Sequence, residues 1–328
     1  MHALGVATVE DAERLVQASP LSHIKVGLSD VDGVMLGKYL RRDKFLGALR
    51  SGLAFCDVVF GWDLDDQLYD NTKYTGWHTA YPDAKLRIVP QTGRRLPLEQ
   101  GPGGEDMLLF LAEFEGDAGA ICPRRLLHRT LDRAAGMGYD VYAALEYEFF
   151  MFRETPHSVR AKHYRNMENW TPGNFGYSML RSTVEGDFYR KLLDMCERMD
   201  MPIEGLHTET GPGVLEAAIA VDQAAAAGDK AFLFKTFTKA LAQQNGLMAT
   251  FMAKWSHDHP GQSGHIHLSL REKKSGRSAF YDESQPHGMS AAQTSFMAGV
   301  QRYLPEFMAL YAQTINSYSR LVPGYWAP

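Results

Sequence analysis

The chain has 328 residues, with 34 lysines and arginines against 39 aspartates and glutamates, which leaves a net charge of −5. Hydrophobic residues make up 45% of it and charged residues 22%, and these globular proportions exclude a disordered, collagen-like or coiled-coil chain. The mild acidity and the absence of a long lysine and arginine run argue against a general nucleic-acid binder.

The first 115 residues indicate a small α+β unit. Thr8 is a suitable cap for a short helix, and the pair Asp32-Gly33 is typical of a hairpin turn. Residues 61–95 are expected to be rich in loops, because Pro82 and Pro90 interrupt any periodicity. The other expected elements are a helix ending near Ala18, strands His23–Ser29 and Val34–Leu40, a helix Asp43–Leu49, and strands Ala54–Phe60 and Asp106–Phe114.

The remainder of the chain alternates helices and strands. Because single cores rarely grow beyond about 250–300 residues, we expect two domains, residues 1–115 and 116–328. Pro123 suits the first position of a helix, and Pro305 is expected to interrupt the last one. The expected helices are 123–136, 185–199, 222–244 and 290–313, and the expected strands are 139–152, 203–207, 215–220, 247–254 and 265–270.

Cysteine usage and the N-terminus indicate a reducing compartment. Cys56, Cys122 and Cys196 are unevenly spaced and form neither a disulfide framework nor a zinc motif. The first fifteen residues lack the basic and apolar regions of a signal peptide, and no apolar run approaches the roughly 20 residues that span a bilayer. We therefore expect a cytoplasmic protein with no membrane partner.

Two carboxylates lie two residues apart in the strand that starts at Tyr139. Side chains alternate along a strand, so Glu146 and Glu148 project from one face among apolar neighbours. Like charges in such a place repel each other and lose solvation unless something neutralises them. A divalent cation would do so, and a polar edge strand with a salt-bridged carboxylate is an equally good interpretation.

A turn joins two further carboxylates. Glu209 follows a strand, Gly211-Pro212-Gly213 reverses the chain, and Glu216 lies in the next strand. Such a turn can bring two carboxylates to one point, although a lone pair of this kind is more often an exposed loop.

His265, His267 and Ser269 share one face of a later strand. A histidine pair at this spacing can bind a metal or a phosphate oxygen, although it is more often structural. Four glutamates and one histidine would form an oxygen-rich site suited to Mg²⁺ or Mn²⁺ rather than structural zinc. The chain has no P-loop and no GxSxG motif.

Taken in order, these motifs resemble the glutamine synthetase family. The matching blocks are Glu146-Tyr-Glu148, Glu209 with Gly211-Pro212-Gly213 and Glu216, Gly264-His265-Ile-His267-Leu-Ser269-Leu, and Asn316-Ser-Tyr-Ser-Arg320-Leu-Val-Pro-Gly-Tyr. The resemblance implies an α+β fold: a small N-terminal β-grasp domain, then a catalytic α/β domain whose antiparallel sheet and flanking helices form a funnel.

The same resemblance implies roles for the residues of the motifs. Glu148, Glu209 and Glu216 would hold one Mg²⁺ or Mn²⁺, and Glu146 with His265 a second. Glu204 would meet the ribose of ATP, His267 its phosphates and Ser269 its base. Arg320 would contact the substrate carboxylate or the transferred phosphate. The implied activity joins the γ-carboxylate of glutamate to an amine through γ-glutamyl phosphate.

Three departures from the family pattern bear on this activity. Where members that use ammonia have a glutamate in the C-terminal flap, the chain has Trp326, which suits an organic amine. The family's asparagine before the first histidine is absent, because the loop reads Pro260-Gly261-Gln262. The chain also ends at Pro328, where family members continue with several arginines and a further metal-binding glutamate.

We therefore expect a glutamate–amine ligase that prefers an organic amine. A true glutamine synthetase that uses ammonia and a non-catalytic relative that only assembles or binds are the alternatives. The resemblance also implies a ring-shaped homo-oligomer, by family a dodecamer, with sites shared between subunits. The neighbour's contribution would come from the segment around Trp62, where Asp57 and Asp63 are the candidates for the amine site.

Overall fold

The computed structural model describes residues 4–324, and they form two compact units. The first unit comprises the described residues up to Asp132 together with Asp194–Met201 and Gly228–Thr236, and the second comprises the rest. Each unit is built on its own sheet. The predicted division into domains at residues 115 and 116 stays a prediction. None of the described helices is both long and apolar enough to cross a membrane.

The first unit carries a five-stranded sheet in the order β2-β1-β5-β4-β3. Its β1 and β2 form the predicted hairpin, and β1 runs parallel to β5. Thr8 caps the first helix through a capping box with Asp11. The elements up to the boundary are α1 (Val9–Ala18), β1 (His23–Ser29), β2 (Met35–Arg41), α2 (Arg42–Ser51), β3 (Leu53–Cys56), η1 (Asp57–Phe60), β4 (Asp83–Gln100), β5 (Asp106–Phe114), α3 (Ala118–Ile121) and α4 (Pro123–Gly136), whose last turn belongs to the second unit.

Two expectations for the first unit were wrong. The region expected to be loop-rich contains β4, which begins at Asp83 and pairs with both β3 and β5. The pairing of β4 with β5 shifts register between Val89 and Arg94. Pro90 is accommodated there, because a residue in a bulge does not have to donate an N–H to the neighbouring strand. The strand expected to reach Phe60 ends at Cys56 and continues as a 3₁₀ turn. Burial of an apolar run does not by itself specify a strand.

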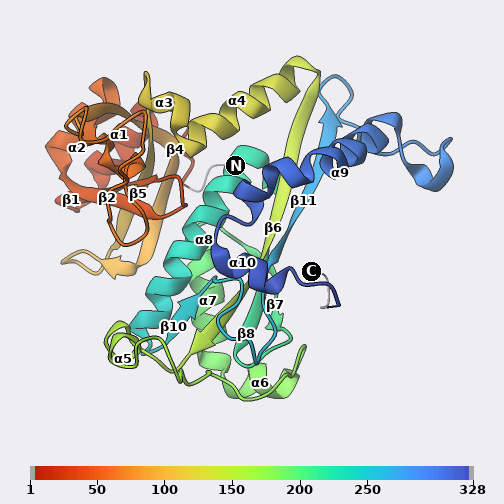
Figure 1. The fold of residues 1–328 in the computed structure, drawn as a ribbon. Coiled ribbons are helices and arrows are strands. Elements are labelled where there is room, and N and C mark those ends of the chain that lie inside the picture. The colour runs from red at the N-terminus through yellow and green to blue at the C-terminus, as the bar shows by residue number, and fades with distance from the viewer. Residues whose placement is uncertain (1–3, 325–328) are drawn as a thin grey trace. The chain divides into compact units, whose positions relative to one another are not determined.

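The second unit is organised around β6, which Figure 1 shows as the long yellow-green strand with β11 beside it. Along one edge β6 pairs with β10 and β11, and along the other with β8 and β9, all antiparallel; β7 pairs with β8. The strands are β6 (Tyr139–Phe152), β7 (Ile203–Thr208), β8 (Val214–Ile219), β9 (Asp222–Gln223), β10 (Met248–Thr250) and β11 (Gly264–Glu272).

The helices that follow β6 in the chain are α5 (Pro156–Ala161), α6 (Met179–Val184), α7 (Gly186–Arg198), α8 (Ala224–Gln244), η2 (Pro286–Gly288), α9 (Ala291–Tyr311) and α10 (Ile315–Arg320). Pro305 does not interrupt α9 as expected, because one missing N–H leaves the bonds of the neighbouring turns intact. The half of β6 that follows the paired glutamates carries Phe149, Phe150 and Phe152, which are fully buried and hold that strand in place.

Candidate metal and nucleotide site

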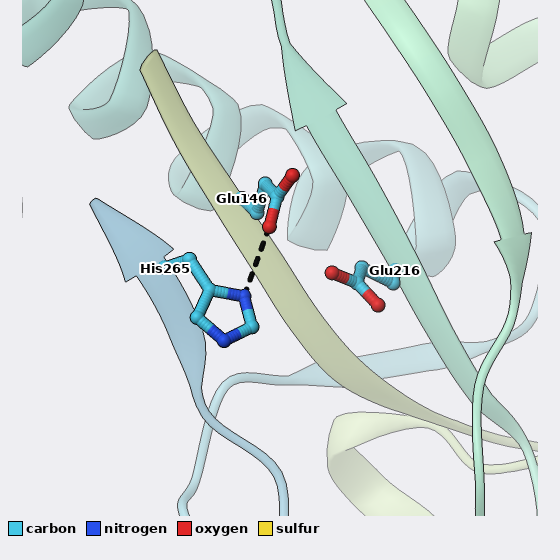
Figure 2. Close-up of side chains that lie close together, drawn as sticks. All are labelled: Glu146, Glu216 and His265. Carbon is cyan, nitrogen blue, oxygen red and sulfur yellow. Dashed lines mark hydrogen bonds and ion pairs between the residues drawn. The ribbon is translucent and has the colours of Figure 1, made fainter. Parts of the chain in front are cut away.

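Three neighbouring strands present the predicted carboxylates and histidines on one face of the second sheet. Glu148 on β6 lies opposite Glu216 on β8, and Glu146 lies opposite His265 on β11. Because side chains two residues apart share a face, His267 joins the same group. Figure 2 shows the side chains of Glu146, Glu216 and His265 turned toward one another from these strands. The alternation in the sequence predicted which side chains share a face within each strand, and the register of the strands brings those faces together.

Hydrogen bonds orient the carboxylates of β6. His265 Nδ1 donates to Glu146 Oε2 over 2.9 Å, and His267 Nε2 lies 3.3 Å from the same oxygen. The carboxylate of Glu148 accepts a bond from the backbone N–H of Ser263, in the loop that leads into β11. Both glutamates are therefore held by β11 and the residues before it.

The turn after β7 brings Glu209 to the same place. Glu209 donates its N–H to Val214 O over 3.0 Å, which closes the turn and returns the chain to Glu216. His207 lies between the two carboxylates, with Nδ1 3.8 Å from Glu209 Oε2 and Nε2 3.7 Å from Glu216 Oε2. The exposed-loop interpretation is wrong for Glu216, which lies in β8 and is largely covered.

Gly213 makes this turn possible, and its replacement by alanine is expected to reduce the free energy of unfolding by about 3 kcal/mol. Its φ is +71°, and an added Cβ would lie 2.5 Å from the carbonyl oxygen of Met151 on β6. Gly246 is the matched control, because its φ is +69° and an added Cβ would meet no atom within 4 Å.

Urea denaturation of both variants measures the difference. G246A is expected to lose about 1 kcal/mol from the backbone conformation alone. An equal loss in G213A and G246A would contradict a turn held tightly against β6.

The electrostatics of the cluster favour a cation. Burial raises the pKa of Glu216, and the neighbouring Glu148 carboxylate raises it further. Burial also raises the pKa of Glu146, but hydrogen bonds from His267 and His265 outweigh that effect and leave its pKa lowered. The cluster thus concentrates several carboxylates at one place. A bound divalent cation would relieve this repulsion directly.

Within residues 4–324, two groups of side chains have ligand atoms close enough together for one ion. Glu146, Glu216 and His265 form the first, and His207, Glu209 and Glu216 the second; within each group the ligand atoms lie within 4.8 Å of one another. Carboxylate oxygens with a minority of imidazole nitrogens suit Mg²⁺ or Mn²⁺. The donor set therefore fits the cations that the resemblance implied.

A cavity of about 620 Å³ adjoins the cluster. Glu148, Glu209 and His265 line one part of it, and the cationic residues Lys254 and Arg320 also line it. Arg320 ends α10 and packs on Gly261, where an added Cβ would lie 2.7 Å from Arg320 Cγ. The cavity therefore presents both cation-binding and anion-binding groups to one occupant.

The other residues predicted for the site are Glu204, Ser269, Trp326 and Asp57. Glu204 is exposed on β7 and belongs to neither group of potential metal ligands. Ser269 is half-buried on β11, opposite Tyr142. Trp326 lies outside the described residues. In the first unit Asp57 is only 3% exposed and accepts a bond from Thr75 Oγ1 over 2.6 Å.

Sequence reasoning missed three residues of the site. His207 precedes Glu209 by two residues, and that spacing was the available signal. Tyr177 stacks on His207, with ring centroids 4.4 Å apart and an interplanar angle of 28°. Lys254 is buried and donates from Nζ to the carbonyl oxygen of His259 over 2.8 Å. Nothing near Tyr177 or Lys254 in the sequence pointed to the site.

Comparison with known proteins identifies the class of protein that this sheet and cluster define. A family model described as the catalytic domain of glutamine synthetase matches residues 120–328. The chain belongs to the glutamine synthetase family.

Three curated relatives illustrate its range. Type-1 glutamine synthetase 2 of Dictyostelium discoideum is 43% identical over 316 residues, which are 95% of this chain and 60% of that protein. Glutamate–isopropylamine ligase of a Pseudomonas species is 31% identical, over 95% of this chain and 68% of that protein. Gamma-glutamylethanolamide synthetase GlnA4 of Streptomyces coelicolor is 33% identical, over 98% and 68%. The chain thus spans about 60–68% of the length of these relatives.

Solved structures show the same fold. An ADP complex of GmaS superposes with a TM-score of 0.79 at 19% identity, covering 96% of this chain and 68% of that one. Glutamine synthetase of Plasmodium falciparum gives a TM-score of 0.80 at 18% identity, over 99% of this chain and 65% of that one. The predicted fold class, a mixed helix and sheet fold of the glutamine synthetase type, is confirmed.

Proposed function

We propose that the protein is an ATP-dependent ligase that joins the γ-carboxylate of glutamate to an amine. The observation that carries the proposal is the convergence of three glutamates and two histidines on one sheet face, with Glu209 from the turn after β7, beside a cavity lined by Arg320 and Lys254. Phosphoryl transfer to a carboxylate brings like charges together, so it needs cationic groups on both sides of the reacting atoms.

The proposed metal ligands are those that the family resemblance implies. Glu148, Glu209 and Glu216 would hold one Mg²⁺ or Mn²⁺, and Glu146 with His265 a second. Glu209 and Glu216 share one group of close ligand atoms and Glu146 and His265 share the other, whereas Glu148 belongs to neither. When bound, these ions neutralise charge on the phosphates and on the attacking carboxylate. The chain's own part is to orient the ligands: His265 of β11 bonds to Glu146, and the N–H of Ser263, in the loop before β11, bonds to Glu148.

The other side chains would bind the substrates. His267 would contact the phosphates of ATP, Ser269 the base and Glu204 the ribose. Arg320 would bind the carboxylate that attacks ATP or the phosphate that is transferred, and Lys254 supports the loop beside it. Attack of the γ-carboxylate on the terminal phosphorus releases ADP and forms γ-glutamyl phosphate; the amine then displaces phosphate and leaves an amide.

We further propose an organic amine as the acceptor. Trp326 occupies the flap position at which ammonia-using members have a glutamate, and an indole offers a flat apolar wall but no carboxylate to take a proton. Two relatives bear the names of isopropylamine and ethanolamide enzymes. Glutamine synthesis from ammonia is the second candidate, supported by the 43% identity to the Dictyostelium protein.

Release of ADP by the purified protein with glutamate, ATP and Mn²⁺ tests the proposal across ammonium, alkylamines, polyamines and anilines. Stimulation by an organic amine is the expected result, with no stimulation when glutamate is omitted. Stimulation by ammonium alone would contradict the organic-amine proposal in favour of glutamine synthesis. A protein that binds neither Mn²⁺ nor an ATP analogue would support the non-catalytic alternative.

The assembly is a separate proposal. We propose a homo-oligomer, a ring as the family resemblance implies, whose sites take Asp57 or Asp63 from a neighbouring subunit, in the cytoplasm. Light scattering of the purified protein measures its mass, and a value near the 36.7 kDa of one chain would contradict a shared site.

A further inference from the structure

The first unit contains a cavity of about 160 Å³ that shares no residue with the candidate metal and nucleotide site. Its walls come from the C-terminal ends of β1 and β5, which run parallel to each other, and from the first turns of α4 and α8. Every residue that lines it belongs to the first unit. The cavity is therefore a feature of that unit alone, and no step of the proposed reaction uses it.

Small residues leave this space open. Ala112 in β5 and Cys122, just before α4, are buried on its wall, and neither side chain is long enough to fill it. Gly228 of α8 has no side chain, and an added Cβ would lie 3.0 Å from Leu127 Cδ2 on α4. The glycine therefore lets the two helices approach each other closely beside the cavity without filling it.

Most of the lining is apolar. Leu28 and Leu111 are each 2% exposed, so they belong to the buried part of the wall. Leu127 and Phe232 are half-buried, and they mark the side on which the cavity meets the surface of the unit. A molecule that enters past these two residues would thus be surrounded by leucine, alanine and phenylalanine side chains.

The polar side chains of the wall already have partners. Ser29 Oγ donates to the carbonyl oxygen of Asp30 over 2.8 Å. Arg124 donates to both carboxylate oxygens of Asp229, from Nε over 3.0 Å and from Nη2 over 3.1 Å. A water molecule in a protein interior needs two to four polar partners, and a polar ligand group without a partner loses its bonds to water. The lining therefore favours an occupant without charge or hydrogen-bonding groups.

We propose that this cavity is a binding site for a small, uncharged, apolar molecule, aromatic or aliphatic, with about six to eight carbon atoms. In another protein, a cavity of about 150 Å³ lined by leucine, isoleucine and phenylalanine stays free of water and binds benzene or xenon. The cavity described here has a similar volume and a similar lining. An occupant supplies the contacts that the atoms around an empty space lack. The site is independent of the proposed ligase function.

Benzene tests the size of the cavity. We expect titration calorimetry to show one benzene site per chain, and the urea midpoint to rise with benzene concentration. A112V adds two carbon atoms at the wall and is expected to weaken benzene binding about tenfold. A54V makes the same change at an exposed position of β3 and is expected to leave the affinity unchanged. Failure of the wild type to bind benzene, or equal affinities in A112V and A54V, would overturn the proposal.

Two neighbouring leucines of α4 provide a test in the opposite direction. L127A enlarges the cavity, whereas L126A removes a side chain that is 53% exposed and does not line it. Ethylbenzene has two carbon atoms more than benzene, and burying them corresponds to about tenfold in affinity. We therefore expect ethylbenzene to bind L127A about tenfold more tightly than L126A. Equal affinities in the two variants would contradict a ligand beside Leu127.

Phenol tests the chemical class of the ligand. It combines the ring of benzene with a hydroxyl group that the occupied polar side chains of the wall leave without a partner. We expect phenol to bind the wild type about tenfold more weakly than benzene. Phenol binding as tight as that of benzene would show that the site takes polar molecules and would overturn the assignment to an apolar ligand.

The thiol of Cys122 locates the occupant without any turnover. Alkylation by a maleimide, followed by peptide mass spectrometry, measures its reaction rate separately from that of Cys56, which is half-buried and lies outside the cavity lining. Benzene at about ten times its Kd is expected to slow alkylation of Cys122 about tenfold and to leave Cys56 unchanged. Equal effects on the two cysteines would place the benzene elsewhere and overturn the site. Because neither rate depends on ADP release, the result separates this inference from the proposed function.

Discussion

Replacing Glu216 by glutamine is expected to weaken Mn²⁺ binding by about a hundredfold or more. Glu216 belongs to both groups of potential ligands, so the substitution removes a charged oxygen from each. Replacing a residue that only orients a metal ligand lowers metal affinity about 10–100-fold. Replacing a direct ligand is therefore expected to lower it by about 100-fold or more. The electron paramagnetic resonance signal of free Mn²⁺ measures the effect.

E272Q is the matched control for this experiment. Glu272 ends β11 opposite Tyr139, seven residues beyond His265. Its side chain is 44% exposed and accepts from Ser275 Oγ. Its replacement is expected to leave Mn²⁺ affinity unchanged. Equal Mn²⁺ affinity in E216Q and the wild type would contradict the metal site. Glutamine keeps the shape of the glutamate side chain, so both variants are expected to fold. Circular dichroism of the same samples checks this.

Replacing Glu113 by glutamine is expected to reduce the free energy of unfolding at pH 7 by about 3 kcal/mol. Glu113 is the last residue but one of β5, its side chain is 1% exposed, and its two oxygens bind Arg87 and Arg124. Arg125 lies 3.4 Å away, and Arg124 also pairs with Asp229 over 3.0 Å. Loss of the buried charge leaves these guanidinium groups without their central partner.

The loss should also depend on pH. Burial raises the pKa of Glu113, but Arg124 and Arg87 outweigh it, and the net pKa is lowered. A carboxyl group with a lowered folded-state pKa stabilises the protein above its unfolded value of about 4.3. That contribution is lost as the pH falls through the folded-state pKa. The difference between wild type and E113Q is therefore expected to shrink below about pH 4.3.

Urea denaturation at several pH values measures both effects. E115Q is the control two residues away, because Glu115 is 32% exposed and pairs with Lys85 over 3.0 Å. A partly exposed pair of this kind is worth about 1 kcal/mol or less. A difference between wild type and E113Q that stays constant into acid would show that packing, and not the charge, accounts for the loss.

Local sequence signals predicted much of the fold. The capping residue Thr8, the turn at Asp30–Gly33 and the proline at position 123 each act within a few residues, so their elements appear at the expected places. β4 was missed because its pairing with β5 is a long-range contact that outweighs the local effect of Pro90. The residues around Pro90 do not indicate which strand β4 will pair with.

The candidate site was also predictable in part. Alternation on β6 and β11 placed Glu146, Glu148, His265 and His267 on shared faces, since the period of a strand is fixed by its backbone. Which faces meet depends on strand order and register, and these decide that Glu148 lies opposite Glu216. No local pattern contains that information.

The sequence by itself therefore determined the family, the identity of the carboxylates and histidines, and the side of each strand on which they stand. Only the tertiary structure decided that His207 stands between Glu209 and Glu216, and that a strained loop lays Tyr177 across it. The physical reason is that backbone periodicity is local. The pairing of β7 with β8 depends on the turn between them, and the bond between Thr208 and Ser178 joins residues 30 positions apart.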